Sequence, residues 1–159
     1  MFSYREKMFW YCDFEGFDIG TGEFIVKEIA ILSSDGLQCY NYHVKNPCKY
    51  PCFPQNATTL FQFYRHRLRW DFGDYNFYEA MNDIWRKVGV NLVLVKGLEK
   101  AKFLQEHLLN VEEMEGVPAF KHLSECRNDW CDVKHGIWCA RRKVHELKRY
   151  ANQNSDYVL

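Results

Sequence analysis

Residues 8–45, MFWYCDFEGFDIGTGEFIVKEIAILSSDGLQCYNYHVK, contain three segments rich in aromatic, apolar and β-branched side chains. These segments, 8–17, 24–32 and 37–45, have the composition and length of β-strands. The sequences DIGTGE and SSDG between them are typical of short turns. We therefore predict an antiparallel meander of three strands near the start of the chain.

Downstream of the meander, helical patterns alternate with one apolar strand pattern. An irregular loop is expected at 46–56, where three prolines fall within eight residues. Apolar residues at helical spacing predict one helix at 76–88 and another that ends near Asn110. The short apolar run at 91–97 between them indicates a buried strand. A final helix is predicted from its apolar face, which comprises Ala140, Val144, Leu147 and Ala151.

Length and composition fit one globular domain. The chain has 159 residues, of which 47% are hydrophobic and 17% aromatic, and this is enough for a single core. Three antiparallel strands followed by a helix, a strand and further helices predict an α/β domain with a mixed sheet flanked by helices. That order of elements is the order of the RNase H-like fold. We expect one domain over 1–152 and a flexible C-terminal tail over 153–159.

Charge and cysteine content limit the function classes. Lys+Arg and Asp+Glu balance at 21 each, so the chain as a whole has no electrostatic preference for nucleic acid. No apolar run is long enough to cross a membrane, and the first residues lack the features of a signal peptide. Seven cysteines, an odd number, then favour an intracellular protein of the cytoplasm or nucleus whose cysteines pack or bind metal.

Asp13 and Glu15 are the first candidates for chemistry. Residues i and i+2 of a strand point to the same face, so the two carboxylates converge if 8–17 is a strand. Converging carboxylates are what a pair of divalent cations needs for phosphodiester cleavage. The alternative is that both acids are solvated at the end of a strand.

This arrangement resembles the DEDD-type 3′–5′ exonucleases, which hold two metal ions with four carboxylates. In that family an aspartate follows the later strand, and matching the shared Phe-Leu pair of KGLEKAKFL puts Lys100 at its position. The last family motif places a histidine four residues before an aspartate. Aligning that motif to CARRK puts Cys139 at the histidine and Lys143 at the aspartate. Because lysines repel Mg²⁺, the resemblance implies that two-metal catalysis has been lost.

A candidate metal site lies near the C-terminus, in the stretch CDVKHGIWC. Cys131, His135 and Cys139 offer two thiolates and an imidazole within nine residues, and this set suits Zn²⁺. Gly136 favours a loop that leads into the last helix. The alternative is two core cysteines and a hydrogen-bonded histidine. Cys126 would complete a local site as the fourth ligand, and Cys48 or Cys52 of the proline-rich loop are further choices.

The run FIVKEIAILSSDGLQCYNYHVKNP resembles the opening of the Maelstrom domain. That domain has an RNase H-like fold that lost the exonuclease carboxylates and holds a Glu-Cys-His-Cys zinc site. The resemblance extends over residues 8–150. The zinc ligands that it implies are Glu28, Cys131, His135 and Cys139. The chain differs from the family in its Cys-x3-His-x3-Cys spacing, in its length, and in keeping Asp13 and Glu15.

Basic residues form two local groups. The sequence RHRLRW combines Arg65, Arg67 and Arg69 with Trp70, a composition suited to phosphate contact and base stacking. Arg141 and Arg142 lie off the apolar face of the predicted last helix and would extend such a surface. The alternative is a solvated basic face that the acidic sequence EEMEG balances.

The resemblance implies a setting in small-RNA-guided, piRNA-type silencing of transposons. We expect a catalytically degenerate domain with one structural zinc that binds single-stranded RNA, protein partners of a silencing complex, or both. The alternative is an unconventional single-strand RNA nuclease in which Asp13 and Glu15 hold one metal ion.

Overall fold

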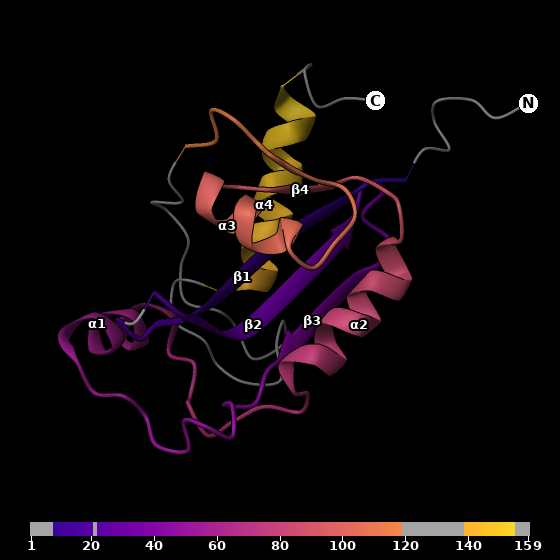
Figure 1. The fold of residues 1–159 in the computed structure, drawn as a ribbon. Coiled ribbons are helices and arrows are strands. Elements are labelled where there is room, and N and C mark those ends of the chain that lie inside the picture. The colour runs from indigo at the N-terminus through magenta and orange to yellow at the C-terminus, as the bar shows by residue number, and fades with distance from the viewer. Residues whose placement is uncertain (1–7, 21, 119–138, 155–159) are drawn as a thin grey trace, which may run out of the picture.

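A five-stranded mixed sheet forms the centre of the molecule (Figure 1). The computed structural model describes residues 8–20, 22–118 and 139–154. The strands are β1 (Trp10–Asp18), β2 (Phe24–Ser33), β3 (Cys39–His43), β4 (Val93–Val95) and β5 (Val111–Glu113). Their order in the sheet is β3-β2-β1-β4-β5; β1, β2 and β3 are antiparallel, and β4 and β5 run parallel to β1. The predicted meander is confirmed.

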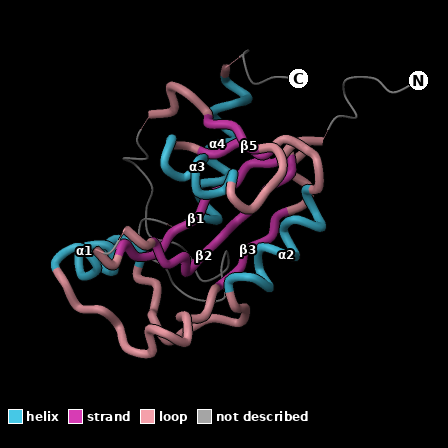
Figure 2. The backbone as a smooth tube through the Cα atoms, in the orientation of Figure 1, coloured by secondary structure: helices cyan, strands magenta, loops and turns pink. Residues whose placement is uncertain are grey.

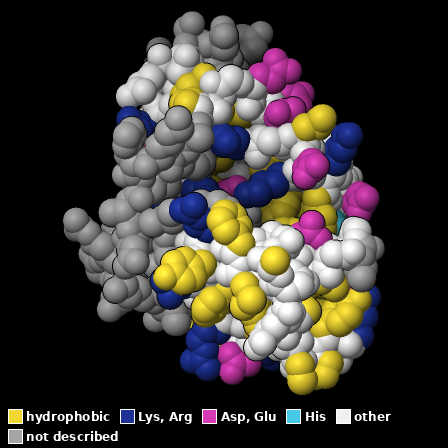
Figure 3. Space-filling model, turned by 90° about the vertical axis from the view of Figure 1, so that its left-hand side faces the viewer, with side chains coloured by type: hydrophobic (Ala, Val, Ile, Leu, Met, Phe, Trp, Pro, Cys, Tyr) yellow, Lys and Arg dark blue, Asp and Glu magenta, His cyan; other side chains and the backbone are white. Residues whose placement is uncertain are grey.

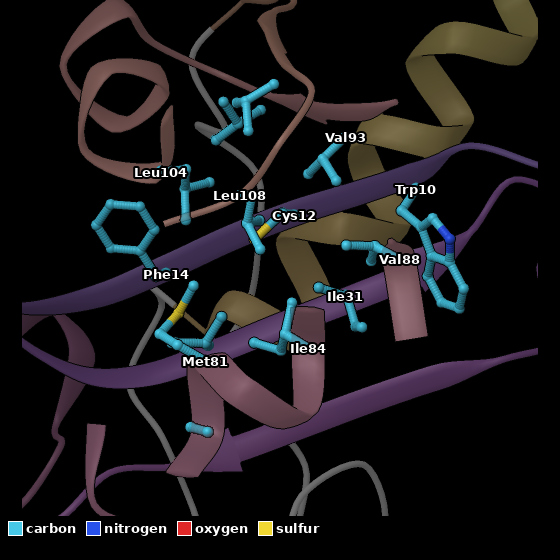
Figure 4. Packing of buried hydrophobic residues seen from close by; sticks show 14 of the residues in the cluster. Trp10, Cys12, Phe14, Ile31, Met81, Ile84, Val88, Val93, Leu104 and Leu108 are labelled. Atoms are coloured by element: carbon cyan, nitrogen blue, oxygen red, sulfur yellow. The ribbon is translucent and has the colours of Figure 1, made fainter. Parts of the chain in front are cut away.

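Helices cover both faces of this sheet. They are α1 (Ala57–His66), α2 (Phe77–Val88), α3 (Leu98–Gln105) and α4 (Ala140–Gln153). Side chains alternate along a strand, so β1 sends Trp10, Cys12 and Phe14 into the core beneath α2 and α3 (Figure 4). Phe9 and Tyr11 pack on the other face against α4. Because β1 is buried on both faces, its sequence is a nearly continuous apolar run.

The last helix was predicted from its apolar face, and this prediction is confirmed. The four residues of that face, Ala140, Val144, Leu147 and Ala151, are all fully buried against the sheet. A fully buried Val or Leu side chain contributes about 1.5–3 kcal/mol, so this face holds α4 firmly on β1 and β2. None of the helices in the described ranges is long and apolar enough to cross a membrane.

The sequence analysis did not predict two of the elements, α1 and β5. Asn56 caps α1 and forms a capping box with Thr59, which is a readable start signal. The helical pattern of α1 is weak for two reasons. Many of its residues are β-branched or aromatic, and these are poor helix formers. Several of its apolar side chains also face solvent, so they do not mark a buried side of the helix. β5 is a three-residue edge strand in an acidic sequence.

Element boundaries also differ from the predictions. α3 ends at Gln105, several residues before Asn110, and β4 is shorter than the apolar run at 91–97. The loop predicted at 46–56 is irregular, as expected (Figure 2). Prolines explain this loop because they lack the backbone N–H that regular elements need.

Candidate functional site

The central strand β1 carries two acidic side chains into the interior. Asp13 and Glu15 retain only 2% and 7% of their exposure, and both lie on the α4 face of the sheet. A β-bulge follows them at Glu15 and Gly16. A Cβ at Gly16 would lie 1.9 Å from the carbonyl oxygen of Ile25, so only glycine fits there. Bulges of this kind often re-aim side chains beside functional sites.

Two lysines meet these carboxylates. From α3, the Lys100 Nζ lies 2.7 Å from Asp13 Oδ1 and 3.2 Å from Glu15 Oε1. From α4, the Lys143 Nζ donates to Glu15 Oε1 and lies 3.4 Å from Asp13 Oδ2. We call these four residues the ion cluster. Its two lysines are the residues that the exonuclease alignment put at the positions of two missing aspartates.

The charges of the ion cluster stabilise one another. Burial alone would raise the pKa of Glu15, but the Lys100 and Lys143 ammonium groups outweigh burial and hold that pKa below its usual value. Burial alone would lower the pKa of Lys100, but Asp13 and Glu15 outweigh it and raise that pKa. Glu15 and Lys100 are therefore ionised at physiological pH.

A cleft of about 350 Å³ opens beside the ion cluster. Its lining comprises Asp13, Lys96, Gly97, Leu98, Glu99, Lys100 and Lys143. Figure 3 shows Lys/Arg and acidic side chains next to one another in a hollow on this side of the molecule. Lys100 keeps 28% of its side-chain exposure, so the ion cluster is reached from solvent through this lysine.

The geometry disfavours a divalent cation in the ion cluster. Ammonium groups already contact both carboxylates, and a metal ion would have to displace them against their charge. Among the residues that the structure describes, no group of three His, Cys, Asp or Glu side chains is placed to hold a metal ion.

Glu28, the glutamate that the Maelstrom resemblance implied as a zinc ligand, is fully buried in β2. Its Oε1 accepts a hydrogen bond of 2.8 Å from the backbone N–H of Ala140, and its Oε2 accepts one of 3.1 Å from Asn41 Nδ2. Cys139, the buried N-cap residue of α4, directly precedes Ala140. Two of the expected ligands are therefore neighbours. Cys126, Cys131 and His135 lie outside the described residues.

Sequence reasoning missed two further residues of β3, one opposite Glu28 and one that interacts with Cys139. His43 is buried in β3 and is the cross-strand partner of Glu28. Cys39 lies on the same strand; burial raises the pKa of its thiol, Arg141 lowers it and Cys139 raises it. The meander predicted from the sequence could have revealed His43, since its register places this histidine opposite Glu28. Cys48 and Cys52, the other candidate ligands, are both exposed.

Trp70 does not provide the surface for base stacking that the sequence suggested. It is 7% exposed and packs against Phe17 and Phe53. Its indole Nε1 donates to the carbonyl of Tyr50, 3.0 Å away, while the Lys27 Nζ donates to the carbonyl of Trp70 itself at 2.8 Å. These contacts fix Trp70 in a buried apolar cluster with Phe17, Ile19 and Ile25, so its expected role is wrong.

The arginines of the predicted basic surface differ in their exposure and in their contacts. Arg69 pairs with Asp71 at 3.1 Å in an exposed salt bridge. Arg141 and Arg142, in the first turn of α4, are half-buried, and Arg141 is engaged with Cys39. Arg65 and Arg67, at the end of α1, lie over aromatic rings of that helix.

Chemically, the site is a neutralised carboxylate pair beside a cleft that both lysines and carboxylates line. Its two negative charges are matched by the two lysine ammonium groups. No protein-family model matches the chain, and no curated protein matches it.

Proposed function

We propose that this chain is an RNase H-like domain whose two-metal centre has been replaced by two lysine ammonium groups, so that it binds RNA without cleaving it. The strand order β3-β2-β1-β4-β5, with only β2 antiparallel to the rest, is the order of that fold and supports the proposal. So does the position of the carboxylates on the central strand, with their partners on α3 and α4.

The contact of both lysines with both carboxylates is the observation that carries this proposal. Two-metal hydrolysis needs carboxylate oxygens that coordinate cations and a metal-bound water that attacks the phosphate. In the ion cluster, Lys100 and Lys143 take the carboxylate oxygens instead. Lysine ammonium groups neutralise the carboxylates but do not generate a hydroxide nucleophile. The site therefore keeps its charge balance but cannot hydrolyse a phosphodiester by the two-metal mechanism.

A structural zinc ion is the second part of the proposal. We propose Glu28, Cys131, His135 and Cys139 as its ligands, with Cys126 as the alternative to Glu28. The described half of this set supports the proposal, because the buried Glu28 carboxylate accepts a hydrogen bond from the backbone N–H of Ala140, the residue after Cys139. Four protein ligands leave no open position for water, so the zinc would stabilise the junction of β2 and α4.

The zinc is tested by elemental analysis of the purified chain. We expect one zinc per chain in the parent and in Cys48→Ser, because Cys48 is exposed and is not one of the proposed ligands. Cys139→Ser should lose the metal and melt at a lower temperature, because the free energy of binding at a structural site is folding free energy. A folded parent that contains no metal contradicts the assignment.

The setting follows from the resemblance to the Maelstrom domain: intracellular, piRNA-type silencing of transposons, with single-stranded RNA and proteins of a silencing complex as partners. The test is an assay of binding and cleavage on labelled single-stranded RNA with Mg²⁺ or Mn²⁺. We expect salt-sensitive binding and intact RNA. Cleavage that needs Mn²⁺ and disappears in Asp13→Asn/Glu15→Gln would overturn the proposal in favour of the metal-dependent nuclease.

A further inference from the structure

The outer side of α1 exposes a row of apolar and aromatic side chains. Leu60, Phe61 and Tyr64 are 50%, 54% and 72% exposed, although α1 is only ten residues long. The side that faces the sheet is anchored by Thr59 and His66, which are fully buried. Because Phe61 and Tyr64 are three positions apart, they lie on one side of the helix.

Two guanidinium groups accompany these rings. The Arg65 guanidinium carbon lies 5.2 Å from the centroid of the Phe61 ring, and that of Arg67 lies 4.6 Å from the centroid of the Tyr64 ring. Both arginines are exposed, so their positive charge lies at the surface beside the rings and attracts a phosphate. Figure 3 views the molecule from the side on which α1 lies in Figure 1, and hydrophobic side chains reach the surface there beside Lys and Arg.

The backbone conformation of Arg67 is a second, independent observation that indicates a functional role for this end of α1. Arg67 is the C-cap of α1 with φ 57° and ψ 23°, and it is the one non-glycine residue with a positive φ in the part of the chain that the structure describes. Glycine is the usual residue at this position because side chains are strained there. The chain therefore keeps an arginine where glycine would relax the backbone, and strain of this kind gathers at functional sites.

We propose that Phe61, Tyr64, Arg65 and Arg67 form a docking platform for single-stranded RNA, which we call the α1 platform. Unpaired bases expose the faces that stack on the two rings, and the phosphates between them complement the two guanidinium groups. A duplex hides its base faces, so it fits this surface poorly. The proposal rests on the proposed RNA-binding function and adds the place at which RNA binds.

The α1 platform is joined directly to the ion cluster through β1. His66 Nε2 donates to the carbonyl oxygen of Gly16 at 2.8 Å, and Gly16 follows Glu15 in the chain. The same helix thus presents its platform to solvent and is fixed to the bulge beside the ion cluster.

The test measures fluorescence anisotropy of a labelled oligouridine at several salt concentrations, with the full chain. Phe61→Ala/Tyr64→Ala should weaken binding by roughly fivefold to a hundredfold for each base that no longer stacks. Arg67→Gly should weaken binding and lower the slope of log affinity against log salt by roughly 0.7, one phosphate contact. Its melting temperature should stay equal or rise, because glycine relieves the positive φ.

Two controls separate the platform from general charge and from folding. Arg86→Ala removes an exposed arginine from the last turn of α2 and should leave RNA affinity nearly unchanged. Arg67→Lys keeps the charge but not the planar stacking and should bind with intermediate affinity.

If the parent binds RNA and the platform variants bind equally well, the platform is wrong while the proposed function stands. If the parent has no salt-sensitive affinity for RNA, the proposed function and the platform are both overturned, and the exposed rings are a protein-binding face.

Discussion

Replacing Lys143 by methionine tests the ion cluster energetically. The change keeps the length of the side chain but removes its charge. Among the described residues, the buried Asp13 and Glu15 are then left with Lys100 as their one cationic partner. At an effective dielectric constant near 20, opposite charges 3.4 Å apart, the separation of Lys143 Nζ from Asp13 Oδ2, attract by about 5 kcal/mol. Removing one partner of a buried pair costs about 3–5 kcal/mol in measured cases. We expect Lys143→Met to lose about this much stability.

Urea denaturation followed by tryptophan fluorescence measures this loss. The matched control is Arg149→Met on the same helix, whose exposed pair with Glu146 should be worth less than about 1 kcal/mol. Adding Glu15→Gln to Lys143→Met removes the carboxylate that lost one of its two lysine partners and should recover much of the stability. The double variant also covers the case in which the single variant does not fold. A loss below about 1 kcal/mol in Lys143→Met, or a double variant no more stable than the single one, would refute the reasoning.

Two other predictions concern the junction between α1 and the bulge. Burial is the main cause that lowers the pKa of His66 from 6.5 to about 4, and the charge of Lys143 lowers this pKa as well. The hydrogen bond to Gly16 and the charges of Glu15 and Glu28 raise the pKa of His66, but burial outweighs them. The unfolded chain therefore binds more protons between these pH values, and up to about 3 kcal/mol of stability, present above pH 6.5, is lost as the pH falls toward 4. His66→Gln does not titrate, so its stability should fall less than the parent's over this range, and parallel curves from melts at several pH values would contradict the assignment. Gly16→Ala should destabilise the chain by more than about 2 kcal/mol, because its Cβ would overlap the Ile25 carbonyl oxygen. Equal denaturation midpoints for Gly16→Ala and the parent would show that the bulge relaxes freely.

Local patterns predicted the parts of the fold that have regular periodicity. The meander, α2 and α4 follow from alternation or helical spacing of apolar residues, and each is buried as expected. α1 breaks this rule because its apolar residues face solvent, and β5 is too short to have a period. The same limit explains the error at Trp70: its arginine neighbours suggest a surface, and only tertiary contacts show that it is buried.

Only part of the ion cluster could be predicted from the sequence. The sequence places Asp13 and Glu15 on one face of a strand, but Lys100 and Lys143 follow them by 87 and 128 residues in the pairs that they form. No local pattern encodes contacts across such separations. Alignment to the exonuclease motifs brought the two lysines into consideration, and the structure places their ammonium groups against both carboxylates.

Binding of Mn²⁺ tests most directly whether the lysines replace metal ions. Calorimetric titration compares the parent with Lys100→Asp/Lys143→Asp, which restores four carboxylates. We expect no Asp13-dependent binding to the parent. The double variant should be less stable without metal, bind Mn²⁺, and regain about 2.7 kcal/mol at a concentration a hundred times its Kd. Adding Asp13→Asn should abolish this gain. Binding of Mn²⁺ to the parent that disappears in Asp13→Asn, or a folded double variant that never binds Mn²⁺, would contradict the replacement of metal by lysine.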